Sequence, residues 1–167
     1  MKLLCGVSMA SLALASGVSG AETCRATEAD KAAVVAVLRT FYAALATDDL
    51  AKFRSTAAPG FSAYDSAQAF DSVEALFDTV KKAHEQGVGL VWTVKNPRVT
   101  VYCTSAWLSY LNDGSVTLPG GSAPRPQQWL ESAFLEKRQG VWKIVFFHST
   151  PVPAPAPAPA PAPDESP

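Results

Sequence analysis

The sequence predicts an α+β domain in which N-terminal helices pack inside a strongly curved antiparallel sheet. Apolar residues recur at helical spacing in the first half of the chain, whereas the second half alternates with the period of long strands. Helices that precede the strands, rather than alternating with them, are typical of α+β domains. Because strands of this length must curve around the helices, we expect a cone-shaped fold with an interior cavity.

The helices are predicted from their caps and apolar faces. The first begins at the N-cap residue Thr27, and its buried face is expected to comprise Val34, Val37, Leu38, Phe41, Tyr42 and Leu45. A short second helix is expected from Asp49 to about Ala57. A third begins with the capping pattern of Asp71 and Glu74 and ends at Gly87.

Strand-like alternation covers most of the remaining chain. A short strand is expected at Phe61–Asp65, with Ser66–Phe70 as a turn or a hairpin return. The other expected strands are Val88–Lys95, Arg98–Leu111, Gln128–Arg138 and Val141–Ser149. Asn112-Asp113-Gly114 predicts a turn, and Gln139-Gly140 predicts a tight hairpin.

Both ends of the chain are predicted to lie outside the domain. Residues 1–21 combine Lys2, an apolar stretch and small residues ending at Ala21, which is the layout of a cleaved secretory signal peptide. A retained membrane anchor is the alternative. Residues 151–167 are rich in proline and alanine and favour an extended, disordered tail. The domain is therefore expected at residues 22–150 of a secreted or periplasmic protein that has no membrane contact after cleavage.

Composition and motifs limit which partners and cofactors can be expected. The formal net charge is −1, and no basic stripe is present in the sequence, so nucleic acid is not an expected partner. The chain has 2 histidines, far apart in sequence, which gives a metal site little support. No glycine-rich phosphate loop precedes a predicted helix, and no cofactor is expected.

Cysteines outside the predicted signal peptide occur at positions 24 and 103. In an exported protein, Cys24 and Cys103 are expected to form a disulfide. The alternative is a buried thiol at Cys103 and an unpaired thiol at Cys24.

Several segments together resemble the nuclear-transport-factor-2-like superfamily, and within it the SnoaL-like group of small bacterial proteins. These segments are "LRTFYAALATDDLAKF", "FSAYD", "AWLSYLNDG" and "WLESAFLEKRQGVWKIVFFHSTP". The resemblance implies a cystatin-like cone, an interior cavity for a small-molecule ligand and a homodimer. It does not imply one activity, because the superfamily includes isomerases, cyclases, dehydratases and inert binding or assembly domains.

Ketosteroid isomerase, a member of this superfamily, uses a carboxylate base together with a tyrosine and a protonated acid. Asp65 in "AYDS" falls where the resemblance places the base. The tyrosine position carries Phe41, with Tyr42 beside it. The position of the second donor carries Phe134, and Glu131, the nearest acid, is expected on the opposite strand face.

His148 stands where the last strand ends in "HST". Strand alternation places it on one face with Trp142, Ile144 and Phe146, so it is expected to project into the open end of the cone. The "FFHST" ending is also similar to the "HFH-x-S" ending of calmodulin-dependent kinase association domains. The alternative is a histidine that bonds to a neighbouring strand or to a carboxylate.

The candidate catalytic residues are Asp65 and His148. Asp65 could also be an acceptor for a ligand or an Asx-turn residue. Glu131 could orient His148 as an acid–base pair, unless its face is solvated. The predicted ligand-binding residues are Tyr42, Tyr64, Asp65, Trp107, Trp129, Glu131 and His148. The aromatic members would form pocket walls, or pack in the core and at a dimer interface.

Three functions follow as hypotheses. The first is an exported domain that binds a small, mainly apolar ligand in a conical cavity. The second is a proton-transfer isomerase or dehydratase that uses the same pocket. The third is a dimeric interaction or assembly module without catalysis.

Overall fold

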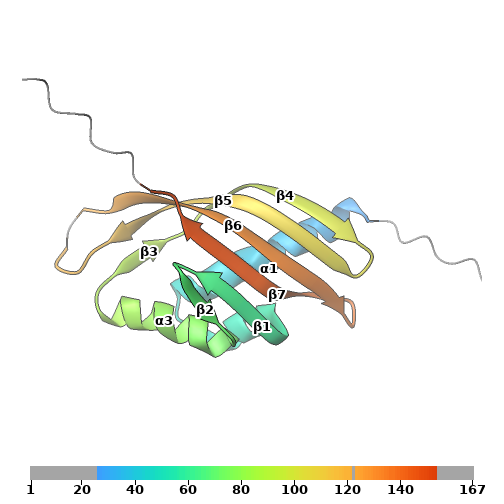
Figure 1. Ribbon diagram of the computed structural model, residues 1–167, viewed down its shortest axis with the longest axis horizontal. Helices are drawn as coiled ribbons and strands as arrows, with labels where there is room; N and C mark the ends of the chain where they lie inside the picture. The colour runs from blue at the N-terminus through green and yellow to red at the C-terminus, as the bar shows by residue number, and fades with distance from the viewer. Residues whose placement is uncertain (1–25, 122, 154–167) are drawn as a thin grey trace, which may run out of the picture.

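The computed structural model describes residues 26–121 and 123–153, which form three helices and a seven-stranded sheet (Figure 1). The helices are α1 (Glu28–Ala46), α2 (Leu50–Thr56) and α3 (Val73–Glu85). The strands are β1 (Ala57–Asp65), β2 (Gln68–Phe70), β3 (Gly89–Val91), β4 (Val94–Tyr102), β5 (Ser105–Thr117), β6 (Arg125–Arg138) and β7 (Val141–Pro151).

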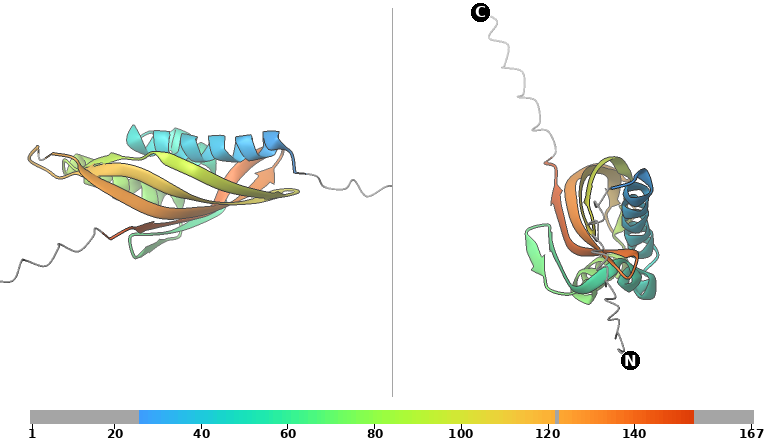
Figure 2. Two further views of the ribbon diagram at one scale, coloured as in Figure 1. Left: turned by 90° about the horizontal axis from the view of Figure 1, so that it is seen from above. Right: turned by 90° about the vertical axis from the view of Figure 1, so that its right-hand side faces the viewer.

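The sheet curls around α1, as the right-hand view of Figure 2 shows. Its strands follow the order β2-β1-β7-β6-β5-β3, and β4 pairs with β5 on the same side as β3. The pairing of β1 with β7 is parallel, and the other pairings are antiparallel. The predicted α+β cone, with helices packed inside a strongly curved sheet, is confirmed, but the sheet is mixed rather than entirely antiparallel, because β1 and β7 run parallel.

The predicted start of α1 is also confirmed. The Thr27 hydroxyl accepts a 3.1 Å hydrogen bond from the Asp30 amide, and the Asp30 carboxylate accepts one from the Thr27 amide at 3.2 Å. The Lys137 ammonium donates to the same carboxylate at 2.8 Å and holds the pKa of Asp30 down at about 2. This ion pair fastens the beginning of α1 to β6.

The third helix begins one residue later than its sequence pattern predicts. Ser72, rather than Asp71, is the N-cap, because the Ser72 hydroxyl accepts the 3.2 Å hydrogen bond from the Ala75 amide. The Glu74 carboxylate accepts a 2.5 Å hydrogen bond from Arg54 on α2, so it is not used in a capping box.

The predicted strand Arg98–Leu111 is in fact a hairpin. β4 ends at Tyr102 and β5 begins at Ser105, with Cys103 at a left-handed φ of 50° between them. Cys103 is disulfide-bonded. Its predicted partner, Cys24, lies outside the described residues, so the pairing stays a prediction.

The predicted turn at Asn112–Gly114 is also wrong, because these residues continue β5. Asn112 is fully buried and pairs with Trp129 of β6. Gly114 is required by a close approach of the backbone, since a Cβ atom there would lie 1.8 Å from the Val91 carbonyl oxygen.

A β-bulge in β7 decides which side chains face the helices. Phe146 pairs with Phe134 and Ile144 pairs with Leu135, which leaves Val145 as an extra residue in the strand. Trp142 and Ile144 are buried before the bulge, and Phe147 and Ser149 are buried after it. Simple alternation would have placed Phe146 and His148 inside, so the predicted face of His148 is wrong.

Aromatic side chains fill the space between α1 and the sheet. The ring of Phe41 contacts Phe53 of α2 at a centroid distance of 4.6 Å and Phe147 of β7 at 5.0 Å.

Among the described residues, none of the helices is both long enough and apolar enough to cross a membrane.

Candidate functional site

Four polar residues form one row across the inner face of the sheet. Tyr110 of β5 pairs with Glu131 of β6, which pairs with Ser149 of β7, and Ser149 pairs with Asp65 of β1. Paired residues of neighbouring strands project on the same side with Cβ atoms about 5 Å apart. We refer to Tyr110, Glu131, Ser149 and Asp65 as the Glu131 row. Strand pairing therefore brings together residues that are far apart in the sequence.

The carboxylate of Glu131 is only 5% exposed and accepts three side-chain hydrogen bonds. Its Oε1 accepts from the Ser149 hydroxyl at 2.9 Å, and its Oε2 accepts from the Asn112 amide nitrogen at 3.1 Å. Tyr42 of α1 also donates its hydroxyl proton to Oε2. The Tyr110 hydroxyl lies 2.9 Å from the Tyr42 hydroxyl and donates to it, because the Tyr42 proton is already directed at Glu131.

Burial dominates the acid–base properties of this network. It raises the pKa of Glu131 from 4.5 to about 7, although the hydrogen bonds from Tyr42, Ser149 and Asn112 work in the opposite direction. Burial also raises the pKa of Tyr42 and of Tyr110 well above 10, and the neighbouring Glu131 carboxylate adds to both increases. At neutral pH the tyrosines keep their protons, whereas Glu131 is partly protonated because its pKa is about 7.

Asp65 ends the row at the tip of β1. Partial burial raises the pKa of its carboxyl group, and interactions with Ser149, Ser66 and His148 partly offset this increase. The Ser66 hydroxyl donates a 3.2 Å hydrogen bond to the carboxylate. Asp65 is thus a second acid with a raised pKa, one strand away from Ser149.

An interior pocket of about 110 Å³ lies beside this end of the row. Its polar lining residues include Asp65 and Ser149, which come from the adjoining ends of β1 and β7. Its aromatic walls are supplied by Tyr42, Trp92, Trp129 and Phe147. Glu131 lies behind this lining and is connected to it by the hydrogen bonds from Ser149 and Tyr42. The arrangement can bind a small molecule at a polar end and can pass a proton between Glu131 and a hydroxyl of the lining.

The structure brings together a part of the predicted site. Tyr42, Asp65 and Trp129 line the interior pocket, and Glu131 is joined to it. Glu131 does not orient His148, because the two side chains point to opposite faces of the sheet. Its hydrogen-bond partners are Tyr42, Asn112 and Ser149 instead.

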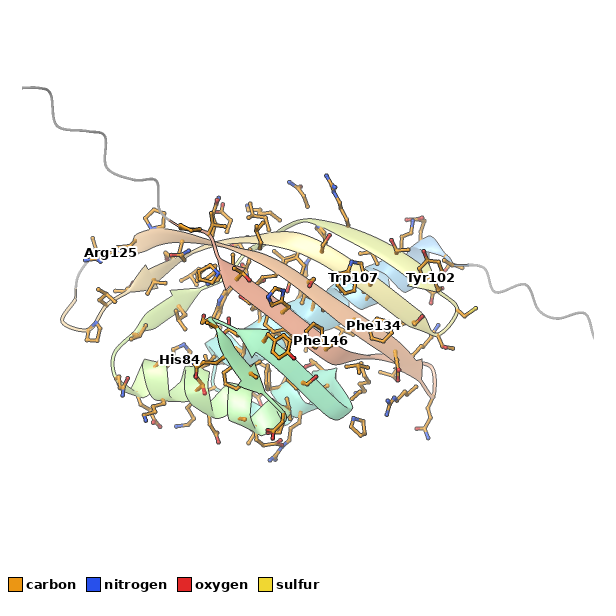
Figure 3. The ribbon with its side chains drawn as sticks, viewed as in Figure 1. His84, Tyr102, Trp107, Arg125, Phe134 and Phe146 are labelled. Carbon is orange, nitrogen blue, oxygen red and sulfur yellow. The ribbon has the colours of Figure 1, made fainter. Side chains whose placement is uncertain are left out.

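Three predicted residues lie on the outer face of the sheet. His148 and Tyr64 pair across β7 and β1 and line a groove on the outside of the sheet. The Nε2 atom of His148 is 3.1 Å from the Thr150 hydroxyl. Trp107 is 46% exposed and lies in a row with Phe134 and Phe146 across β5, β6 and β7 (Figure 3). We refer to Trp107, Phe134 and Phe146 as the outer aromatic row.

The predicted ligand-binding set lacks four residues that the structure places at the site, namely Trp92, Tyr110, Asn112 and Ser149. The pattern around Asn112 predicts a turn, and simple alternation along β7 predicts that Ser149 points outward, because the bulge at Val145 is not visible in the sequence. A usable signal was the alternation of Ala106, Leu108, Tyr110 and Asn112, which are all buried. Within the part of the chain that the structure describes, no cluster of His, Cys, Asp and Glu could hold a metal ion.

Comparisons with known proteins agree with this architecture. A family model described as SnoaL-like domain matches residues 34–155. No curated protein sequence matches the chain.

Solved structures with the same fold come from several organisms. A ketosteroid isomerase-like protein from Erwinia carotovora atroseptica has a TM-score of 0.63 and 16% identity, over 77% of this chain and 100% of that chain. A protein of unknown function with a cystatin-like fold from Nostoc punctiforme has a TM-score of 0.64 and 14% identity, over 77% and 95%. The association domain of calcium/calmodulin-dependent kinase II from C. elegans has a TM-score of 0.61 and 19% identity, over 73% and 95%. Similarity at this level shows a shared fold and no more.

Proposed function

Because the chain belongs to the SnoaL-like domain family, we propose that it binds a small, mainly apolar molecule in the interior pocket. The observation that carries this proposal is the polar end of the pocket, where Asp65 and Ser149 stand in front of the buried Glu131. An apolar body would contact the aromatic walls, and one polar group of the molecule would contact Asp65 and Ser149. Such a combination is typical of small-molecule sites.

The size of the pocket restricts the ligand. A cavity of about 150 Å³ in another protein binds benzene, whereas this pocket has about 110 Å³. The ligand is therefore no larger than one ring or a short branched chain, unless side chains move. A four-ring steroid would not fit this pocket.

The hydrogen bonds that Tyr42, Asn112 and Ser149 donate to Glu131 support a functional role for this end of the cone. Burying a carboxyl group is costly even with three donors, and replacing an entire buried network of this kind with well-packed apolar residues is often neutral or stabilising. Buried acids with raised pKa values that lie beside a pocket are typical of functional sites.

The test is a ligand-observed NMR screen of one-ring and short-chain fragments, with Val80→Phe as a variant that fills the pocket. Val80 lines the pocket from α3, whereas the control, Val141→Phe, changes an exposed residue at the start of β7. We expect fragments that bind the parent protein and Val141→Phe and do not bind Val80→Phe. Equal binding to all three proteins, or no binding to the parent, would contradict the proposal.

A proton-transfer enzyme is the second candidate, and the two acids with raised pKa values favour it. Asp65 would remove a proton from a carbon next to a carbonyl group. In molecules in which Glu131 is protonated, Tyr42 would be free to donate its hydroxyl proton to the developing negative charge on the oxygen. Cyclohex-3-enone, a one-ring substrate, would then be converted to its conjugated isomer, which absorbs in the ultraviolet.

In this test, Asp65→Asn should reduce the isomerisation rate by at least about 100-fold, the usual effect of losing a general base. Asp78→Asn, on the exposed side of α3, is the control with the same change of charge. A parent rate equal to that of buffer, or an unchanged rate in Asp65→Asn, would exclude this activity. A dehydratase would need a hydroxylated substrate of the same size.

The outer aromatic row favours an additional role in self-association. Exposed aromatic surface on one face of a sheet is typical of protein interfaces, and Tyr64, at 56% exposure, packs against Phe146 at a ring distance of 5.5 Å. We propose that a second copy covers this face. Sedimentation velocity should then show a dimer for the parent and a monomer for Trp107→Lys. Val141→Lys, away from the row, should remain dimeric.

Export is proposed from the sequence alone, on the signal-peptide layout of residues 1–21. The predicted signal peptide and most of the Pro/Ala tail lie outside the described residues. N-terminal sequencing of the protein produced in its own cell should find Glu22 as the first residue. A protein that keeps Met1–Ala21 would contradict the proposed cleavage.

A further inference from the structure

The interior pocket carries negative charge and has no positive charge to balance it. Its lining contains the carboxyl group of Asp65 and no lysine, arginine or histidine. A second acid, Glu131, is joined to this lining through Ser149 and Tyr42. Among the described residues, no ion pair includes Asp65 or Glu131. His148 is the basic residue that influences Asp65, and it does so from the outer face of the sheet.

The hydrogen bonds of the network leave acceptors, rather than donors, at the polar end. Ser149 has one hydroxyl proton, which is directed at Glu131 and also interacts with Asp65, so only oxygen lone pairs remain for a ligand. The Tyr42 proton is likewise directed at Glu131, and its oxygen accepts from Tyr110. A ligand at this end therefore meets a carboxylate and a hydroxyl oxygen that accept hydrogen bonds.

The walls of the pocket also suit a positive charge. Tyr42 and Trp92 have ring centroids 5.7 Å apart, and Tyr42 and Phe147 have centroids 6.4 Å apart. Trp129, only 8% exposed, lines the same pocket. Cations are attracted to the faces of such rings, and this attraction grows when water is excluded.

We propose that the ligand of the interior pocket is a small organic cation, namely the ammonium form of a short-chain or one-ring amine. The ammonium group donates to the Asp65 carboxylate and to the Ser149 oxygen, while its hydrocarbon part contacts the aromatic walls. This inference rests on the proposed binding function and names the class of ligand. A carboxylate ligand would be repelled by Asp65 and would find no donor on Ser149.

The experiment compares three probes of similar shape by isothermal titration calorimetry. Isopentylamine is a cation at neutral pH, isopentyl alcohol is neutral, and isovalerate is an anion. We expect isopentylamine to bind at least about tenfold more tightly than the alcohol, since hydrogen bonds between charged groups are the stronger ones. Isovalerate should show no binding.

Two variants and one control locate the effect. Asp65→Asn keeps the shape of the side chain and removes its charge, so it should weaken isopentylamine by at least about tenfold and leave the alcohol nearly unchanged. Ser149→Ala removes the hydroxyl acceptor and should weaken the amine as well, although less. Asp78→Asn changes the net charge equally on an exposed part of α3 and should have no effect.

The outcomes separate the two proposals. If the alcohol binds as tightly as the amine, or isovalerate binds more tightly than either, the cation inference is wrong and the binding function stands. If the amine binds equally to the parent and to Asp65→Asn, the inference is also wrong. If none of the probes binds and the fragment screen finds no ligand that Val80→Phe excludes, both proposals fail.

Discussion

Tyr42 donates its hydroxyl proton to the carboxylate of Glu131, although the two residues are 89 positions apart in the chain. This hydrogen bond joins α1 to the middle of the sheet. It also connects a residue that lines the interior pocket to an acid that titrates near neutral pH. The stability of the domain and the chemistry of the pocket therefore depend on the same pair of side chains.

Glu131→Gln should change how stability depends on pH. The pKa of Glu131 is about 7 in the folded protein and close to the ordinary 4.5 in the unfolded chain. The folded state thus binds more protons than the unfolded state between these values, so its free energy of unfolding falls as the pH rises through this interval. For Glu131 alone the fall is at most about 3 kcal/mol.

Urea unfolding at several pH values between about 4.5 and about 8 measures this slope. The glutamine side chain does not titrate, so the slope should be smaller in Glu131→Gln than in the parent. Asp65 contributes a residual slope of the same sign, because its pKa is raised too. Parallel curves for the two proteins would show that Glu131 does not titrate in this interval.

Tyr42→Phe should destabilise the domain by about 1–3 kcal/mol, because it leaves the buried Glu131 carboxylate with one donor fewer and the Tyr110 hydroxyl without its acceptor. The pKa of Glu131 should rise further, which NMR titration of its side-chain carboxyl can follow. Tyr64→Phe removes a hydroxyl from a residue that is 56% exposed and should change stability by less than about 0.5 kcal/mol. Equal effects of both substitutions would contradict the role of the network.

Insertion of one alanine after Phe146 should destabilise the fold by at least about 3 kcal/mol. The added residue would turn Phe147 and Ser149 outward and His148 inward, because side chains alternate between the two faces of β7. Loss of a buried phenylalanine alone costs about 3–5 kcal/mol. Deletion of Val145 removes the bulge but keeps Phe147 and Ser149 on the inner face, so it should cost less than the insertion, which chemical denaturation can measure. An insertion variant as stable as the deletion variant would show that β7 tolerates either set of faces.

Gly114→Ala should cost at least about 2 kcal/mol, because the new methyl group would lie 1.8 Å from the Val91 carbonyl oxygen and the backbone must move. Gly89→Ala is the matched control in the neighbouring strand. There the nearest atom is the Thr117 side chain at 3.2 Å, which moves more easily. Thermal unfolding of the two variants compares them directly. Similar melting temperatures would mean that β3 and β5 separate without cost.

Local sequence patterns were enough to predict the helices. Thr27 and Asp30 occupy one short segment, and their capping interactions form within it. The buried face of α1 follows from its spacing of 3.6 residues per turn, which needs no knowledge of the partner strands. The same reasoning located β6, whose alternation is long and regular, and the extent of β7, whose alternation is interrupted by the bulge at Val145.

The strand boundaries were harder to predict, because the turn between β4 and β5 contains neither glycine nor proline. Cys103 takes the left-handed conformation there, although cysteine is not a residue type that predicts this conformation. Conversely, Asn112-Asp113-Gly114 resembles a turn but continues β5. Its glycine is explained by the carbonyl group of Val91 on another strand.

The sequence by itself determined the class of fold, the order of helices and strands, and the presence of Tyr42, Asp65 and Glu131 as polar residues in largely apolar elements. Only the tertiary structure decided that Tyr110, Glu131, Ser149 and Asp65 stand in one row beside the interior pocket, and that His148 faces away from it. The physical reason is strand register. One bulged residue, Val145, reverses every side chain after it, and its position depends on pairing with β1 and β6 rather than on the residues of β7 alone.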